Sequence, residues 1–77
     1  MPLFRFVLVE QGQPDWGRAF ECADDQAAVA EGHALVAHQL MLRPAAALRM
    51  TVARVDGTVL GHCGPDGAFE PAPDGPA

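Results

Sequence analysis

The chain has 77 residues, the length of one small domain, and 49% of them are hydrophobic, which is ample for a packed core. Its net charge is −5, and its five basic residues are arginines scattered along the sequence. This balance argues against nucleic acids and anionic membranes as partners. The absence of lysine also excludes Schiff-base chemistry and a phosphate-binding lysine loop.

The first predicted element is a strand from Leu3 to Glu10, rich in β-branched and aromatic residues and followed by a segment with glycine and proline. Strand alternation places on one face Phe4, Phe6 and Leu8. It places on the other face Leu3, Arg5, Val7 and Val9. Because both faces are largely apolar, we expect this strand to be central and covered on more than one side.

Residues 11–15 contain Gly12 and Pro14 and are predicted to form a turn. A short second strand is expected from Arg18 to Cys22, in a hairpin with the first. Trp16 lies between the turn and this strand. It is a candidate partner anchor, since tryptophan is enriched at interaction hot spots, and the alternative is a lid over the end of the core.

The segment from Asp24 to Leu42 is predicted to be one amphipathic helix, with Asp24 as its N-cap and Pro44 preventing its continuation. Its apolar stripe comprises Val29, Gly32, His33, Val36 and Leu40. Gly32 lies inside this stripe, where the missing side chain would let a strand approach closely. Leu35 flanks the stripe and widens the apolar surface beyond what one small sheet needs, which points to a second partner.

Two further strands are predicted from Leu48 to Val55 and from Thr58 to Cys63. Asp56-Gly57 between them predicts a two-residue type I′ turn. This turn would pair Val55 with Thr58, Ala53 with Leu60 and Thr51 with His62. Residues 64–77 hold four of the seven prolines and one large apolar residue, Phe69. We therefore expect a single domain over residues 1–63 and a disordered, acidic Pro/Gly-rich tail over residues 64–77. The alternative is that Phe69 docks onto the body of the domain or onto a neighbour.

The predicted fold is α+β, with ββαββ order and an antiparallel four-stranded sheet that carries one amphipathic helix on one face. The other face of the sheet keeps apolar side chains, and a second copy of the chain is the simplest cover. The interface candidates are Phe4, Phe6, Val7, Val9, Trp16 and Leu35.

The opening residues, Met1 to Phe6, resemble the Met-Pro-any-aromatic-any-Phe strand signature of a family of small bacterial proteins known as a domain of unknown function. Other segments similar to that family are Phe20 to Asp24, Ala27 to Ala34 and Val52 to Leu60. The chain departs from the pattern at Gln11-Gly12-Gln13, where the family has an acidic Asp-Gly turn, and in carrying the tail. The resemblance implies the ββαββ fold and a bacterial cytoplasmic setting, and it implies no activity.

A second hypothesis is a small-molecule- or metal-binding protein that uses Cys22, His33, His62 and Cys63, since two thiolates and two imidazoles can hold zinc. The spacing does not favour it, because there is no Cys-x-x-Cys and the adjacent His62 and Cys63 point to opposite faces of a strand. A nucleophilic Cys22 is opposed by the neighbouring carboxylates of Asp24 and Asp25. We therefore expect reduced core cysteines, no metal and no cofactor.

The sequence thus favours a small non-enzymatic protein-interaction module that acts as a homodimer and binds another protein through a sheet edge or an apolar face, because it offers no coherent acid–base pair for an enzyme. The stretch from Leu3 to Val9 is interrupted by Arg5 and lacks the features of a signal peptide. No apolar run approaches the ~20 residues of a membrane helix. We expect the protein to be cytoplasmic.

Overall fold

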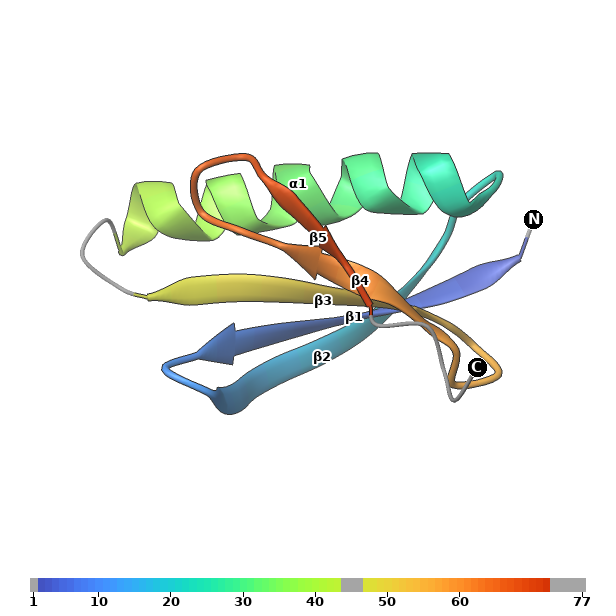
Figure 1. Ribbon diagram of the computed structural model, residues 1–77, viewed down its shortest axis with the longest axis horizontal. Coiled ribbons are helices and arrows are strands. Elements are labelled where there is room, and N and C mark those ends of the chain that lie inside the picture. The colour runs from blue at the N-terminus through green and yellow to red at the C-terminus, as the bar shows by residue number, and fades with distance from the viewer. Residues whose placement is uncertain (1, 44–46, 73–77) are drawn as a thin grey trace.

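The computed structural model describes residues 2–43 and 47–72, and its one helix covers one face of a five-stranded antiparallel sheet (Figure 1). The elements in chain order are β1 (Leu3–Glu10), β2 (Gln13–Glu21), α1 (Asp25–Leu42), β3 (Leu48–Arg54), β4 (Val59–Cys63) and β5 (Phe69–Pro71). Across the sheet the order is β2-β1-β3-β4-β5. The predicted α+β class and antiparallel sheet are confirmed, and the sheet has one strand more than the four predicted.

The helix α1 begins where the sequence predicts. Asp24 is extended, and its carboxylate accepts a hydrogen bond from the Ala27 amide at 2.8 Å, as an N-cap does. At the other end, the amide of Arg43 donates to the Gln39 carbonyl at 2.9 Å, and Pro44 lies outside the described residues. Within the described residues no helix is long and apolar enough to span a membrane.

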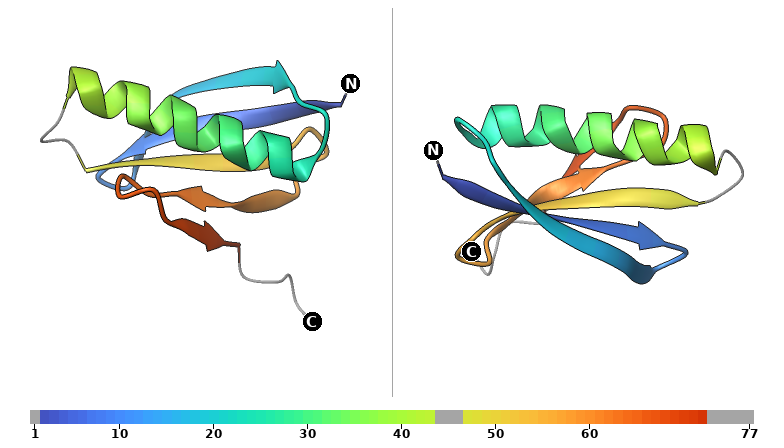
Figure 2. Two further views of the ribbon diagram at one scale, coloured as in Figure 1. Left: turned by 90° about the horizontal axis from the view of Figure 1, so that it is seen from above. Right: turned by 180° about the vertical axis from the view of Figure 1, so that it is seen from behind.

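The core lies between α1 and the strands beneath it, chiefly β3 and β4 (Figure 2). Gly32 makes the close approach that the sequence predicts. A Cβ atom at this position would lie 2.7 Å from Cγ2 of Val52 and 2.9 Å from Sγ of Cys63. The strand side chains that are fully buried below the helix are Phe6, Leu8, Leu48, Met50, Val52 and Cys63.

The first hairpin is tighter than predicted. Gln11 and Gly12 both have positive φ, 52° and 80°, and form a two-residue turn of the type I′ class that pairs Glu10 with Gln13. Strand β2 therefore begins at Gln13, and its predicted start at Arg18 is wrong. Pro14 fits because β2 is an edge strand, where a residue without an amide hydrogen is tolerated.

The second hairpin has a three-residue loop, so the predicted type I′ turn at Asp56-Gly57 is wrong. The amide of Gly57 donates to the Arg54 carbonyl at 2.9 Å, and the Arg54 amide donates to the Thr58 carbonyl at 2.8 Å. Within this loop only Gly57 has positive φ, as in a type I turn closed by a glycine bulge.

The longer loop shifts the pairing by one residue, and a second irregularity reverses the shift. Ala53 pairs with Val59 instead of the predicted Leu60. The next pair is Val52 with Gly61, so Leu60 is an extra residue in β4. The predicted pair of Thr51 with His62 is thereby restored and confirmed.

Strand β5 lies in the segment that the sequence predicts to be disordered, and it is a correction to that expectation. Residues 64–68 repeat the preceding turn, with the Gly64 amide donating to the Ala68 carbonyl at 2.8 Å and Asp66 accepting from the Ala68 amide at 3.1 Å. Phe69 then packs over Gly61, where a Cβ atom would overlap its ring. The composition of the tail could not predict this packing contact, because it depends on a glycine in another strand. Residues 73–77 of the tail lie outside the described residues.

Candidate functional site

The sheet face opposite α1 is one candidate functional surface, and we call it the open face. No other helix occurs in residues 2–43 and 47–72, so α1 covers only the side that carries Phe4, Phe6 and Leu8 (Figure 1). Strand pairing aligns one row of the open face across all five strands. This row consists of Gly17, Val7, Thr51, His62 and Glu70.

The open face is apolar at its centre and charged around it. Val7, Val9 and Ala53 are half-buried, while Leu3 and Val59 are 43% and 41% exposed. Thr51 Oγ1 and His62 Nδ1 lie 2.9 Å apart, in hydrogen-bond contact. The charged side chains of this face come from four strands and are Arg5, Glu21, Arg49 and Glu70, of which the last two form an ion pair at 3.0 Å. A mixed surface of this kind suits a protein partner.

The structure separates the six interface candidates. Phe4 and Phe6 are 2% and 0% exposed, since they form the core beneath α1. Trp16 is half-buried on the helix side of β2, with the Arg18 guanidinium 5.4 Å from its ring centroid. Leu35 is half-buried on α1. Of the six, Val7 and Val9 belong to the open face.

The Cys/His set does not converge. Cys63 is buried under α1 with its thiol 3.7 Å from the Val29 carbonyl, whereas His62 next to it lies on the open face. His33 stands edge-on to the Phe69 ring at 6.3 Å. Among the described residues, no three His, Cys, Asp or Glu side chains are grouped so as to hold a metal ion.

Neither thiol is activated for nucleophilic chemistry. Burial raises the pKa of Cys63 to about 11. Burial also raises the pKa of Cys22, and the negative charges of Glu31 and Asp24 raise it further. Because the thiolate is the nucleophile, both shifts favour the unreactive protonated form.

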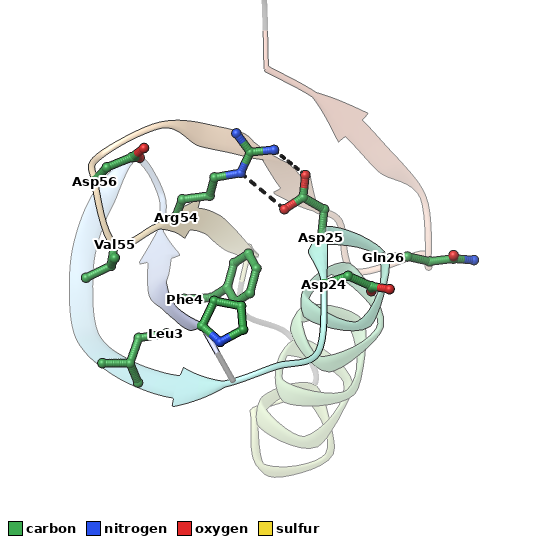
Figure 3. Close-up of a pocket in the computed structure, with 9 residues that line it drawn as sticks. Leu3, Phe4, Asp24, Asp25, Gln26, Arg54, Val55 and Asp56 are labelled. Atoms are coloured by element: carbon green, nitrogen blue, oxygen red, sulfur yellow. Dashed lines mark hydrogen bonds and ion pairs between the residues drawn. The ribbon is translucent and has the colours of Figure 1, made fainter.

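A second candidate is a cavity of about 510 Å³ at the N-terminal end of α1 (Figure 3). Its apolar lining comes from the start of β1 and the β3–β4 loop, and consists of Pro2, Leu3, Phe4 and Val55. Its polar edge includes Asp25 and Arg54, whose side chains make two hydrogen bonds, one of them from Nε to Oδ1 at 3.1 Å. This ion pair ties the helix to the β3–β4 hairpin.

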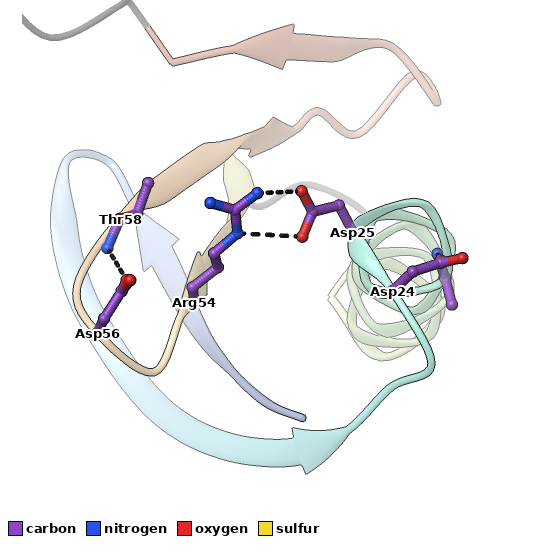
Figure 4. Close-up of polar contacts among 6 residues, drawn as sticks. Asp24, Asp25, Arg54, Asp56 and Thr58 are labelled. Atoms are coloured by element: carbon purple, nitrogen blue, oxygen red, sulfur yellow. Dashed lines mark hydrogen bonds and ion pairs between the residues drawn. The ribbon is translucent and has the colours of Figure 1, made fainter. Parts of the chain in front are cut away.

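The carboxylates beside this cavity are already engaged within the chain (Figure 4). Asp24 caps the helix, and Asp56 accepts a hydrogen bond from the Thr58 amide at 2.9 Å. The hydrogen bonds from Arg54 lower the pKa of Asp25, and the Thr58 hydrogen bond lowers the pKa of Asp56. The Asp25–Arg54 ion pair therefore acts as a latch between helix and hairpin, whereas Asp24 and Asp56 stabilise the helix start and the hairpin loop.

The sequence offered no local signal for this latch, because Asp25 and Arg54 are 29 residues apart. A sheet edge was expected as a binding surface, but the length of the β2 edge was missed, since that strand was predicted to begin at Arg18 and begins at Gln13. Comparisons of the chain with protein-family models, curated proteins and solved structures found no match. The geometry of the open face and of the sheet edge is therefore the basis for a function.

Proposed function

We propose that this protein is a small non-enzymatic interaction module that acts as a homodimer and binds a partner protein through the open face. The observation that carries this proposal is the one-sided cover of the sheet. Val7 and Val9 lie in β1, and they remain partly exposed because α1 packs on the opposite side of the sheet. Burying such side chains against a partner contributes roughly 25 cal/mol per Å² of apolar surface.

The charges of the open face favour a protein over other partners. Arg5 and Arg49 are balanced by Glu21 and Glu70, so the surface has no basic patch of the kind that a nucleic acid needs. The net charge of the whole chain, −5, points the same way. A bacterial cytoplasmic setting, as the N-terminal signature implies, is part of the same proposal.

A small-molecule-binding protein is the second candidate, and the cavity beside Asp25 and Arg54 is the observation that favours it. Its volume of about 510 Å³ lies in the range of ligand pockets. Its carboxylates and its arginine already have partners within the chain, however, and few polar groups remain to orient a ligand. The interaction module is therefore the better supported function.

Native mass spectrometry of the purified full chain separates these two functions. The proposal predicts a species of twice the 8.1 kDa chain mass with no bound small molecule. A single-copy species would overturn the homodimer. A stoichiometric adduct of small mass would favour the ligand-binding alternative.

The role of the open face is tested by a photo-crosslinking amino acid at Val7, with the exposed helix position Ala34 as the matched control. In the cells of origin, Val7 is expected to give an adduct heavier than two copies of the chain. Ala34 is expected to give none. Identical patterns from the two positions would contradict binding through the open face.

A further inference from the structure

The outer edge of β2 offers its backbone to another strand. β2 is the first strand of the sheet order, and β1 is its only neighbour in the part of the chain that the structure describes. The Cys22 amide donates to the Pro2 carbonyl at 3.0 Å, so Cys22 and Pro2 form a hydrogen-bonded pair at the end of the β1–β2 ladder. Along an antiparallel ladder, hydrogen-bonded pairs alternate with non-hydrogen-bonded pairs. The pairs that β1 makes with Gly17, Ala19 and Glu21 are of the second kind, so these three residues direct their amide and carbonyl groups away from β1.

We infer that β2 pairs with β2 of a second copy, antiparallel and centred on Ala19, to make one continuous ten-stranded sheet. This inference rests on the proposed homodimer and states how the two copies join. In this register Ala19 faces Ala19 of the second copy, and Gly17 faces Glu21 of the second copy. The outward-facing positions Gly17, Ala19 and Glu21 of each copy then meet one another, so the pairing satisfies the backbone groups of this part of both edges at once.

The side chains along the edge suit this register in size. Gly17 and Ala19 lie on the open face near the middle of β2. Their side chains are the smallest possible, so neither blocks the approach of a neighbouring strand. A depression of about 190 Å³ lies over Gly17, beside Arg5 and Ala19. Glu21 of the second copy is opposite Gly17 in this register, and its side chain is placed to enter that depression.

The charges also match. Arg5 and Arg18 form no ion pair with any residue in the described ranges, whereas the other three arginines do. Glu21 is likewise exposed and without an ion pair there. The register brings Glu21 of the second copy toward Arg5 on the open face. On the helix side it sets Arg18 opposite the Phe20 ring of the second copy, a cation–aromatic pair.

A two-fold axis at Ala19 closes this assembly at two copies. Each copy uses the same edge, so neither copy keeps a free β2 edge for a third. The open faces of the two copies join into one surface, and both helices lie on the other side. The dimer thereby doubles the open face and leaves it free for a partner protein.

Disulfide trapping of the full chain tests the inference. Ala19→Cys is expected to form a disulfide-linked dimer on mild oxidation, because the Cα atoms of a hydrogen-bonded antiparallel pair lie about 5.5 Å apart, within the range that a disulfide spans. Ala53→Cys is the matched control. It lies in the same row of the open face, on the far side of Arg5, and should not form the link. The native Cys22 and Cys63 are buried, and peptide mapping identifies which cysteines react.

The outcomes separate the inference from the function on which it rests. If the Ala53→Cys variant forms the disulfide and the Ala19→Cys variant does not, the two copies pair face to face. That result would overturn the edge dimer and retain the proposed homodimer. No link in either variant, together with a single-copy native mass, would overturn both.

A charge exchange gives a second measurement that does not depend on cysteine. Glu21→Arg alone places like charges together at two symmetric sites and should raise the dimer Kd about tenfold. The double variant Arg5→Glu/Glu21→Arg should restore the Kd. Equal affinities for all three proteins would overturn the register.

Discussion

Gly32 of α1 and Val52 of β3 approach so closely that a Cβ atom at Gly32 would lie 2.7 Å from Cγ2 of Val52. The helix can sit at this height above the sheet only because position 32 has no side chain. Cys63 of β4 lies on the other side of the same gap, 2.9 Å from that Cβ position. The spacing of the two layers is therefore set by one glycine.

Gly32→Ala should destabilise the protein by up to about 2 kcal/mol. Alanine gains about 1 kcal/mol of helix propensity, but forcing a methyl group into a packed core costs about 1–3 kcal/mol. Urea unfolding measures the difference. Ala34→Gly, at an exposed position of the same helix, is the control and should lose about 1 kcal/mol from propensity alone. A Gly32→Ala variant more stable than the parent chain would contradict the close packing.

Phe69→Ala should lower the free energy of unfolding by about 1–2 kcal/mol, since it removes a partly buried ring from Gly61 and His33. Amide hydrogen exchange should at the same time accelerate in β5. The control is Glu70→Ala, which removes only an exposed ion pair with Arg49, worth about 0–1 kcal/mol. If Phe69→Ala were as stable as the parent chain, β5 would contribute nothing to the fold.

Acid should lower the free energy of unfolding through the Asp25–Arg54 ion pair and the Asp56–Thr58 hydrogen bond. The pKa values of Asp25 and Asp56 are lowered in the folded chain, so their contribution to stability is present above the unfolded carboxyl pKa near 4. It is lost as the pH falls through the lower folded values. Unfolding measured from neutral pH downward should show this loss. Asp25→Asn should flatten the pH dependence, and an unchanged profile in that variant would contradict the assignment.

Alkaline pH should lower the free energy of unfolding through ionisation of the Cys63 thiol. Its pKa of about 11 exceeds the ordinary value of 9.0, so the contribution of the buried thiol is present below pH 9.0 and is lost as the pH rises through about 11. The loss should be on the order of 2 kcal/mol, and Cys63→Ala should not show it. Unfolding experiments at several alkaline pH values provide the comparison. Rapid labelling of Cys63 by iodoacetamide in the folded chain at neutral pH would contradict its burial.

The sequence predicted the parts of the fold that local chemistry determines. The Asp24 cap and the strand from Leu3 to Glu10 lie where expected, and of the predicted helix stripe Gly32 and Val36 are buried, together with Ala28. Each depends on residues that are neighbours along the chain. A carboxylate before an alanine-rich run and a short β-branched segment are sufficient signals.

The parts that were missed are the turn types and the contacts between residues far apart in the sequence. The type I′ turn expected at Asp56-Gly57 is a three-residue loop, and a turn of that class occurs at Gln11-Gly12, where no turn type was predicted. The extra loop residue at the β3–β4 turn was compensated by the bulge at Leu60. Phe69 packs against Gly61 and His33, and the composition of the tail could not predict these contacts. The strand order leaves β2 at the edge of the sheet, and the length of that edge followed from the full extent of the strand.

Sedimentation equilibrium of the untagged full chain over a dilution series is the most direct measurement of the central claim. The account predicts a two-copy species at low micromolar concentration that dissociates on dilution. A single-copy species at every concentration would contradict it.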